Sequence, residues 1–281
     1  MSNSRRGFLR ELGSVVGAAK RAIEPDSPAA APAPDFTAAE LERYSRQLVL
    51  PEWGAAGQLA VSEASVLVIG AGALGSPVAM QLAGAGVGRI GILDGAAVEL
   101  SDLHREALHF TPDVGAPKAE SAAAKLRCVN PEIVIEPYRV RVDATNAAAL
   151  VEGQHLVVDC SGSFATRRAV NAACCAARVP LVEAGVLGMA GLVMSIRPSS
   201  TACYRCVFPV APHDEPRSAD AGVVGPAAGA IGSLQALEAL KLLTGLAPAI
   251  ADGFLQVDLA RAEFVRVRSA RRADCPDCSH L

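Results

Sequence analysis

The sequence has no long hydrophobic run, no surplus of basic residues and few aromatic residues. No stretch approaches the roughly 20 consecutive apolar residues of a membrane-spanning helix, so we expect no membrane span. Lys and Arg number 26 against 29 Asp and Glu, which leaves no basic excess to suggest nucleic-acid binding. The 281 residues are instead rich in Ala, Val, Leu and Gly, a composition typical of a buried parallel sheet wrapped by helices.

The eight cysteines do not have the even spacing of a disulfide framework. Two CxxC pairs match the tetrahedral thiolate coordination of a structural Zn²⁺, which would clip the C-terminal tail onto the loop after a strand at residues 191–197. The proposed ligands are Cys203, Cys206, Cys275 and Cys278. A redox-active CxxC is the rival interpretation, although such motifs usually begin a helix in a thioredoxin-like unit. We expect the other four cysteines to be buried small hydrophobic residues: Cys128, Cys160, Cys174 and Cys175.

The first 34 residues differ from the rest of the chain. They begin with the basic segment SRRGFLR and end in a Pro/Ala-rich stretch that cannot hold a helix, so we expect a disordered tail. Arg5 and Arg6 resemble a twin-arginine export signal, but the segment that should be its apolar core carries Glu11, Lys20 and Arg21. We therefore expect a cytoplasmic protein, with twin-arginine export as the weaker alternative.

A nucleotide cradle at residues 65–94 organises the remaining chain. The apolar run at residues 66–69 predicts a buried parallel strand, and Gly70, Gly72 and Gly75 follow it as GxGxxG. These glycines permit a tight turn, close approach of backbone to a phosphate and packing of the next helix, whose N-terminal amides face the anion. Asp94 ends the second strand, where its carboxylate can accept hydrogen bonds from ribose hydroxyls.

The remaining pattern predicts a Rossmann-like, doubly wound α/β fold with a mainly parallel sheet and an antiparallel C-terminal portion. We expect further strands at residues 132–138, 155–159, 179–182, 191–197, 254–258 and 264–268. Helices are expected at residues 37–60, 118–128, 164–177 and 225–243. A single domain should cover residues 35–281, with a nucleotide-binding half at about residues 60–160 and a second half, holding the zinc site, at about residues 161–281.

Three polar positions lie on loops at the carboxyl side of the predicted sheet, where doubly wound folds bind ligands. Arg105 and Lys118 follow the second strand, and Asp159 ends a later strand just before a loop at residues 160–163. Taken singly, either cation is better explained as part of a surface salt bridge of little consequence.

In chain order, eight segments resemble the MoeB/ThiF/HesA family of ubiquitin-activating-like enzymes. They are RYSRQ, GAGALG, LD with SDLHRE, VGAPK, VVDCSGS, CYRC, DAGVVGP with IGSLQALEALKLLTG, and CPDC, and they extend from about residue 43 to residue 278. The resemblance implies use of ATP and Mg²⁺ to adenylate the C-terminal glycine of a ubiquitin-fold sulfur carrier of the molybdopterin or thiamin type, ending in Gly-Gly. It also implies pyrophosphate release, a homodimer and a structural zinc.

The same resemblance implies roles for individual residues. The glycine loop would hold the nucleotide, Asp94 the ribose, and Arg105 and Lys118 the phosphates. Arg46 would reach as a finger into the site of the partner subunit, and the helix at residues 225–243 would pack against that subunit. Because charge builds on phosphate oxygens during the reaction, fixed cations and a metal are needed and no general base is required.

The sequence departs from the family at three places. Relatives usually have SNLQRQ around the phosphate-binding arginine, whereas SDLHRE here contains Asp102, His104 and Glu106. The aspartate that relatives use for Mg²⁺ is replaced by Gly162, and one hypothesis is that Asp102 has taken over its role. A cysteine of the crossing loop is replaced by Ser218, which cannot form a persulfide or attack an adenylate as a thiolate.

Two interpretations from different classes follow. The first is an adenylyltransferase that stops at the acyl adenylate, and the alternative is a dimeric, nucleotide-binding pseudoenzyme or scaffold that has lost metal-dependent turnover. An NAD-dependent oxidoreductase is a weaker third interpretation, because no hydride-transfer site is visible and the Arg and Lys loops would be unexplained.

Overall fold

The computed structural model describes residues 36–210, 222–248 and 250–281. The predicted tail at residues 1–34, with Arg5 and Arg6, and the crossing-loop residue Ser218 lie outside these ranges. The chain separates into two compact units, Met1–Ala55 and Ala56–Leu281, and the predicted domain boundaries remain predictions. Among the described residues, no helix combines the length and apolarity needed to cross a membrane.

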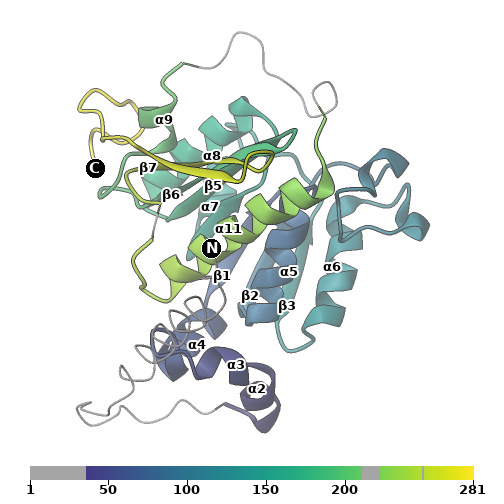
Figure 1. Ribbon diagram of the computed structural model, residues 1–281. Coiled ribbons are helices and arrows are strands. Elements are labelled where there is room, and N and C mark those ends of the chain that lie inside the picture. The colour runs from purple at the N-terminus through teal and green to yellow at the C-terminus, as the bar shows by residue number, and fades with distance from the viewer. Residues whose placement is uncertain (1–35, 211–221, 249) are drawn as a thin grey trace, which may run out of the picture. The chain divides into compact units, whose positions relative to one another are not determined.

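An eight-stranded sheet forms the centre of the second unit, in the order β3-β2-β1-β4-β5-β6-β7-β8 (Figure 1). The first five strands run parallel and β6, β7 and β8 are antiparallel, as the sequence predicts. Their bounds are β1 Ser65–Ile69, β2 Arg89–Leu93, β3 Val134–Tyr138, β4 Leu156–Asp159, β5 Leu181–Leu187, β6 Ala190–Ile196, β7 Gly253–Asp258 and β8 Glu263–Arg268. The carboxyl ends of the parallel strands therefore meet at one edge.

Helices cover both faces of this sheet. One layer contains α5, α6 and α11, and α7 and α8 lie on the opposite face (Figure 1). The bounds are α5 Gly75–Ala85, α6 Lys118–Val129, α7 Ala147–Val151, α8 Phe164–Ala177, α9 Tyr204–Val207 and α11 Gly225–Leu243, with short 3₁₀ turns η1 Leu100–Asp102 and η2 Thr111–Asp113. The apolar residues of β1 and β4 are buried between the layers, as their continuous hydrophobic runs require.

The predicted helix at residues 37–60 is three helices: α2 Ala38–Arg43, α3 Ser45–Leu48 and α4 Gly54–Ser62. Its start is correct, because Thr37 and Glu40 form a capping box at the N-terminus of α2. The single run is wrong because Pro51 cannot continue a helix and Gly54 has a φ of 56°, in the left-handed region.

Other differences are smaller. The strand predicted at residues 179–182 is displaced and extended as β5, because a buried Glu183 and Gly185 interrupt its apolar pattern. Cys128, in the last turn of α6, is exposed rather than buried. Cys160, Cys174 and Cys175 are buried as expected.

Candidate functional site

The glycine cradle lies between β1 and α5, and two of its glycines have no room for a side chain. A Cβ on Gly75 would lie 1.8 Å from the carbonyl oxygen of Gly70, and a Cβ on Gly70, whose φ is 98°, would lie 2.9 Å from that of Cys160. Gly72 is different, because its nearest neighbour would be the flexible Glu106 carboxylate, at 3.3 Å. The cradle is therefore a tight backbone turn in which the half-buried Gly72 faces a movable side chain rather than backbone.

Asp94 is placed next to this turn by the end of β2. Its Oδ2 accepts a hydrogen bond from the Ala71 amide at 3.0 Å, and its Oδ1 accepts one from the Ala96 amide at 2.8 Å. The side chain remains half-buried and keeps further lone pairs. The ribose contact implied by the resemblance remains a prediction, but the carboxylate and the cradle are joined directly.

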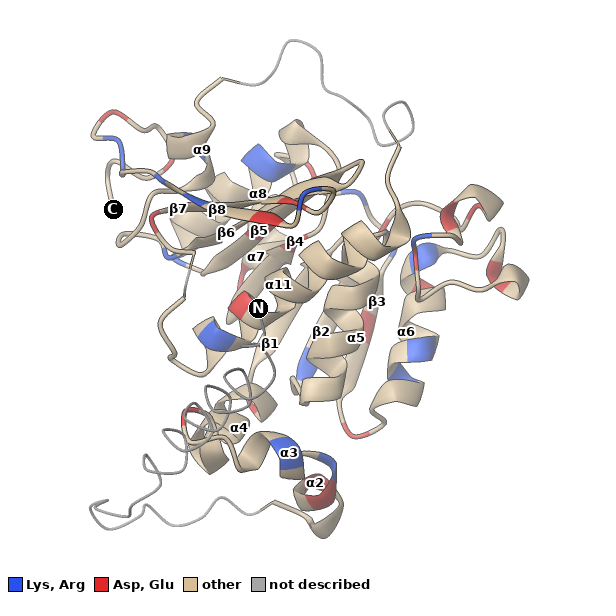
Figure 2. Ribbon diagram, in the orientation of Figure 1, with Lys and Arg blue, Asp and Glu red and all other residues tan. Residues whose placement is uncertain are grey.

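The two predicted phosphate-binding cations belong to a compact cluster of alternating charge. The Nζ of Lys118, at the start of α6, lies 2.8 Å from Oδ2 of Asp102 and 2.9 Å from Oε2 of Glu106. The Nη2 of Arg105 lies 3.0 Å from Oδ1 of Asp102. Figure 2 shows acidic and basic segments side by side in the loops before α6. Lys118 is buried, so the surface salt-bridge interpretation is wrong for it.

Burial sets the protonation of this cluster. Burial raises the pKa of Glu106 to about 7, against the opposing effect of Lys118. Asp102 behaves oppositely: burial raises its pKa, but hydrogen bonds from Lys118 and from the Glu99 amide outweigh that effect and lower it. When all four groups are ionised, the two negative charges of Asp102 and Glu106 cancel the two positive charges of Arg105 and Lys118. The two cations alone would present a net positive charge to a phosphate.

Sequence reasoning missed His109, which joins the cradle to α6. Its Nε2 lies 2.9 Å from the carbonyl oxygen of Ala71, and its Nδ1 lies 2.9 Å from Oγ of Ser121. Burial lowers the pKa of His109, so the neutral ring holds the loop without adding charge. Only its place between SDLHRE and VGAPK could have signalled this role.

The strand-end loop at residues 160–163 follows β4. Asp159 is fully buried, and its Oδ1 accepts a hydrogen bond from the Ser161 amide at 2.8 Å. This burial argues against direct contact of Asp159 with a ligand, and its role in cofactor binding remains a prediction. A Cβ on Gly162 would meet nothing within 4 Å, so the position that holds an aspartate in relatives is open.

The described residues do not form the Mg²⁺ site that the resemblance implies. Position 162 has no side chain, Asp159 is buried, and both oxygens of Asp102 are engaged by cations and a backbone amide. A metal on Asp102 would have to displace Lys118, so the substitution hypothesis remains a prediction without geometric support. No catalytic step is therefore assigned to a metal held by this chain.

The four CxxC cysteines converge, as predicted, and form what we call the four-cysteine centre. Their Sγ atoms all lie within 4.8 Å of one another and the residues are buried. Three separations are 3.8, 3.6 and 3.5 Å, for Cys203–Cys206, Cys203–Cys275 and Cys206–Cys278. Four sulfurs around Zn²⁺ at about 2.3 Å are spaced by about 3.8 Å, so these residues fit a structural zinc and not an isolated redox pair.

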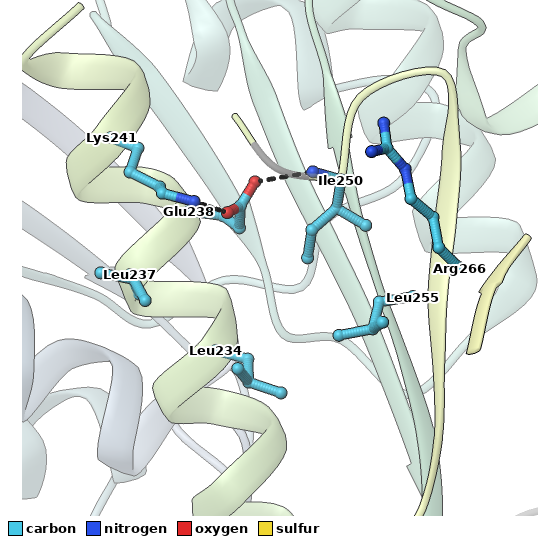
Figure 3. A pocket seen from close by; sticks show the side chains of 7 residues that line it. All are labelled: Leu234, Leu237, Glu238, Lys241, Ile250, Leu255 and Arg266. Carbon is cyan, nitrogen blue, oxygen red and sulfur yellow. Dashed lines mark hydrogen bonds and ion pairs between the residues drawn. The ribbon is translucent and has the colours of Figure 1, made fainter. Parts of the chain in front are cut away.

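A separate groove of about 180 Å³ lies between the second half of α11 and strands β7 and β8 (Figure 3). Its charged lining residues are Glu238, Lys241 and Arg266. The Glu238 carboxylate accepts hydrogen bonds from Ser195 and from the Ile250 amide and pairs with Lys241. These partners satisfy the carboxylate, and the remaining lining is largely apolar.

Arg46 lies exposed on α3 in the first unit. The positions of the two units relative to each other are not determined. The implied role of Arg46 as a finger in a second subunit therefore remains a prediction.

Comparison with known proteins identifies relatives over most of the chain. A sequence model described as the ThiF family matches residues 44–278. The adenylyltransferase and sulfurtransferase MOCS3 of Xenopus laevis is 42% identical over 248 residues, which cover 87% of this chain and 55% of that protein. The sulfur carrier protein adenylyltransferase of Thermus thermophilus is 41% identical over 250 residues, which cover 86% of this chain and 92% of that protein.

Solved structures share the fold. E. coli MccB, in a crystal structure with ATP, aligns with a TM-score of 0.75 at 23% sequence identity, over 84% of this chain and 74% of that chain. The chain spans about half the length of the MOCS3 relatives from Xenopus laevis and Sus scrofa, and nearly all of the Thermus thermophilus protein.

Proposed function

This chain belongs to the ThiF family, and on that premise we propose that it is an ATP-dependent adenylyltransferase. Its substrate would be a small ubiquitin-fold sulfur carrier that ends in Gly-Gly, of the molybdopterin or thiamin type. The observation that carries this proposal is the meeting of the glycine cradle, Asp94, Arg105 and Lys118 at one edge of the sheet.

Adenylation requires the protein to position the reacting groups and to stabilise negative charge on the phosphates. Attack of the glycine carboxylate on the α-phosphate places negative charge on phosphate oxygens and releases pyrophosphate. Arg105 and Lys118 would stabilise that charge, provided that ATP draws them away from Asp102 and Glu106. Asp94 and the cradle amides would fix the nucleoside and phosphates, so that the reacting groups are held in place.

We further propose that the product is the acyl adenylate itself. Ser218, which lies outside the described residues, cannot provide the thiolate needed for a covalent transfer step. Sulfur would then come from another protein. The four-cysteine centre would hold one structural zinc, and a homodimer would bring Arg46 to the partner's site.

Pyrophosphate exchange into ATP, with candidate Gly-Gly carriers, tests this function. We expect exchange that depends on the carrier and falls at least about 100-fold in Arg105→Ala, because a transition-state cation is lost. Arg89→Ala is the matched control, since Arg89 forms an exposed ion pair with Glu136 at the amino end of β2. Tight ATP binding without exchange for any carrier would instead indicate a nucleotide-binding scaffold.

A further inference from the structure

Helix α8 connects the strand-end loop at residues 160–163 to the two CxxC segments at residues 203–206 and 275–278, which we call the cysteine knuckles. Arg167 and Asn171 are one turn apart, so their side chains leave the same face of the helix. Arg167 contacts the loop, and Asn171 contacts both knuckles. Adenylation chemistry alone requires neither contact.

Arg167 holds the loop at residues 160–163 through its guanidinium group. Its Nη2 donates hydrogen bonds to the carbonyl oxygens of Ser161, at 3.0 Å, and of Ala184, at 3.1 Å. Its Nε lies 3.0 Å from Oε1 of Glu183. The amide of the same Ser161 donates to Asp159, so one peptide segment is held at both its N–H and its C=O.

The anchor of Arg167 is a buried pair of acids on neighbouring strands. Asp159 of β4 is the register partner of Glu183 of β5, and both are fully buried. Burial raises the pKa of both carboxyls, against the opposing effect of the Arg167 guanidinium. The position of Arg167 is therefore fixed by charge as well as by hydrogen bonds.

The loop held by Arg167 lies directly against the nucleotide cradle. The carbonyl oxygen of Cys160 occupies the space that a Cβ on Gly70 would need. Because there is no free space between the two loops at this contact, a displacement of residues 160–163 toward Gly70 must also displace the cradle.

Asn171 uses its whole side-chain amide on the knuckles. Its Oδ1 accepts from the Tyr204 amide at 2.9 Å, and its Nδ2 donates to Oδ2 of Asp277 at 2.8 Å while lying 3.6 Å from Sγ of Cys203. Tyr204 also interacts with the Arg167 guanidinium through its buried side chain. Both knuckles therefore contact α8 through Asn171, and α8 in turn contacts the loop at residues 160–163 through Arg167.

We propose that α8 couples the four-cysteine centre to the nucleotide site, with Arg167 and Asn171 as positioning residues. The inference rests on the nucleotide-binding function proposed above. Coupling between two bound ligands is reciprocal in their affinities, so a bound nucleotide must raise the affinity for zinc by the factor with which zinc raises the affinity for the nucleotide. When zinc is released reversibly before the dye captures it, the rate of zinc transfer falls by the same factor.

The test measures zinc transfer from the zinc-loaded full-length protein to a chelating dye. It is run with and without a non-hydrolysable ATP analogue, with Mg²⁺ in excess, and nucleotide binding is measured separately by calorimetry. We expect saturating analogue to slow zinc transfer at least about fivefold in the unaltered protein and in Arg178→Lys, an exposed control at the end of α8. In Arg167→Lys we expect less than about a twofold effect, although the analogue still binds.

Unchanged zinc transfer in the unaltered protein with the analogue bound would overturn the coupling and leave the proposed function standing. Absence of nucleotide binding would overturn both. Full protection in Arg167→Lys would overturn the role of Arg167. If Arg167→Lys does not fold, Tyr204→Phe replaces it, because it removes the hydroxyl that meets Arg167 and keeps the ring; full protection there would count against the coupling in the same way.

Discussion

At the scale of single residues, the charge available to a phosphate depends on the partners of each cation. Lys118 and Arg105 each lie within ion-pair distance of both Asp102 and Glu106, although the Arg105–Glu106 pair is long, at 3.9 Å. Glu106 also lies beside Gly72. Relatives with SNLQRQ would have neutral amides at both acidic positions. ATP binding here must therefore offset an attraction that those relatives lack.

The first residue-scale prediction concerns Glu106 and pH. With a pKa raised to about 7, its carboxyl is mostly neutral at pH 6 and mostly ionised at pH 8, where it repels phosphate and holds Lys118. The dissociation constant for ATP should therefore increase by roughly threefold to tenfold from pH 6 to pH 8. Glu106→Gln should bind ATP more tightly at pH 8 and remove most of this dependence, as measured by calorimetry at both pH values.

Glu120→Gln is the matched control, since Glu120 lies exposed on α6. An unaltered pH profile in Glu106→Gln would show that another group titrates.

The second prediction concerns the open position at Gly162. A Cβ there meets nothing within 4 Å, so an aspartate fits and returns the carboxylate that relatives use for Mg²⁺. Gly162→Asp should lower the Mg²⁺ concentration for half-maximal pyrophosphate exchange by at least about threefold, because a carboxylate is a preferred ligand. Gly162→Asn has the same shape without the charge; an equal effect from it would contradict the metal-ligand explanation.

At the scale of elements, the cradle glycines should separate folding from binding. Gly75→Ala puts a methyl group 1.8 Å from the Gly70 carbonyl oxygen, so we expect a loss of about 3 kcal/mol or more in the free energy of unfolding. Gly72→Ala meets only a movable side chain, so it should leave the melting temperature nearly unchanged while weakening ATP binding. Thermal melts with and without ATP distinguish the two, and equal destabilisation would contradict the assignment.

Elements were predictable where a local pattern carries the whole signal. The bounds of α8 and α11 follow from composition and helix signals, and the CxxC spacing predicts the convergence of four cysteines. The single helix predicted at residues 37–60 fails for the local reason given by Pro51 and Gly54. The failures at the site have non-local causes: the partners of Lys118 depend on tertiary contact between α6 and the loop that precedes it. Glu183 could not be recognised as part of a buried charge network, because its partner Arg167 lies on a different element.

At the scale of the whole molecule, the four-cysteine centre ties the C-terminal tail to the body of the second unit. We expect one zinc per chain by elemental analysis. Cys278→Ser should lose most of this zinc and lower the melting temperature by at least about 5 °C, because zinc binding contributes directly to folding. Cys128→Ser is the control, since that cysteine is exposed and distant in sequence from both knuckles. Zinc retained at full stoichiometry in Cys278→Ser would refute the predicted ligand set.

Direct detection of the adenylated carrier tests the central claim most closely. The protein is incubated with ATP, Mg²⁺ and a carrier ending in Gly-Gly, the products are trapped with hydroxylamine, and intact masses are recorded. We expect a carrier hydroxamate at the C-terminal glycine, formed with release of pyrophosphate, absent with Arg105→Ala and present with Arg89→Ala. ATP binding without any modified carrier, across carriers of the molybdopterin and thiamin types, would contradict it.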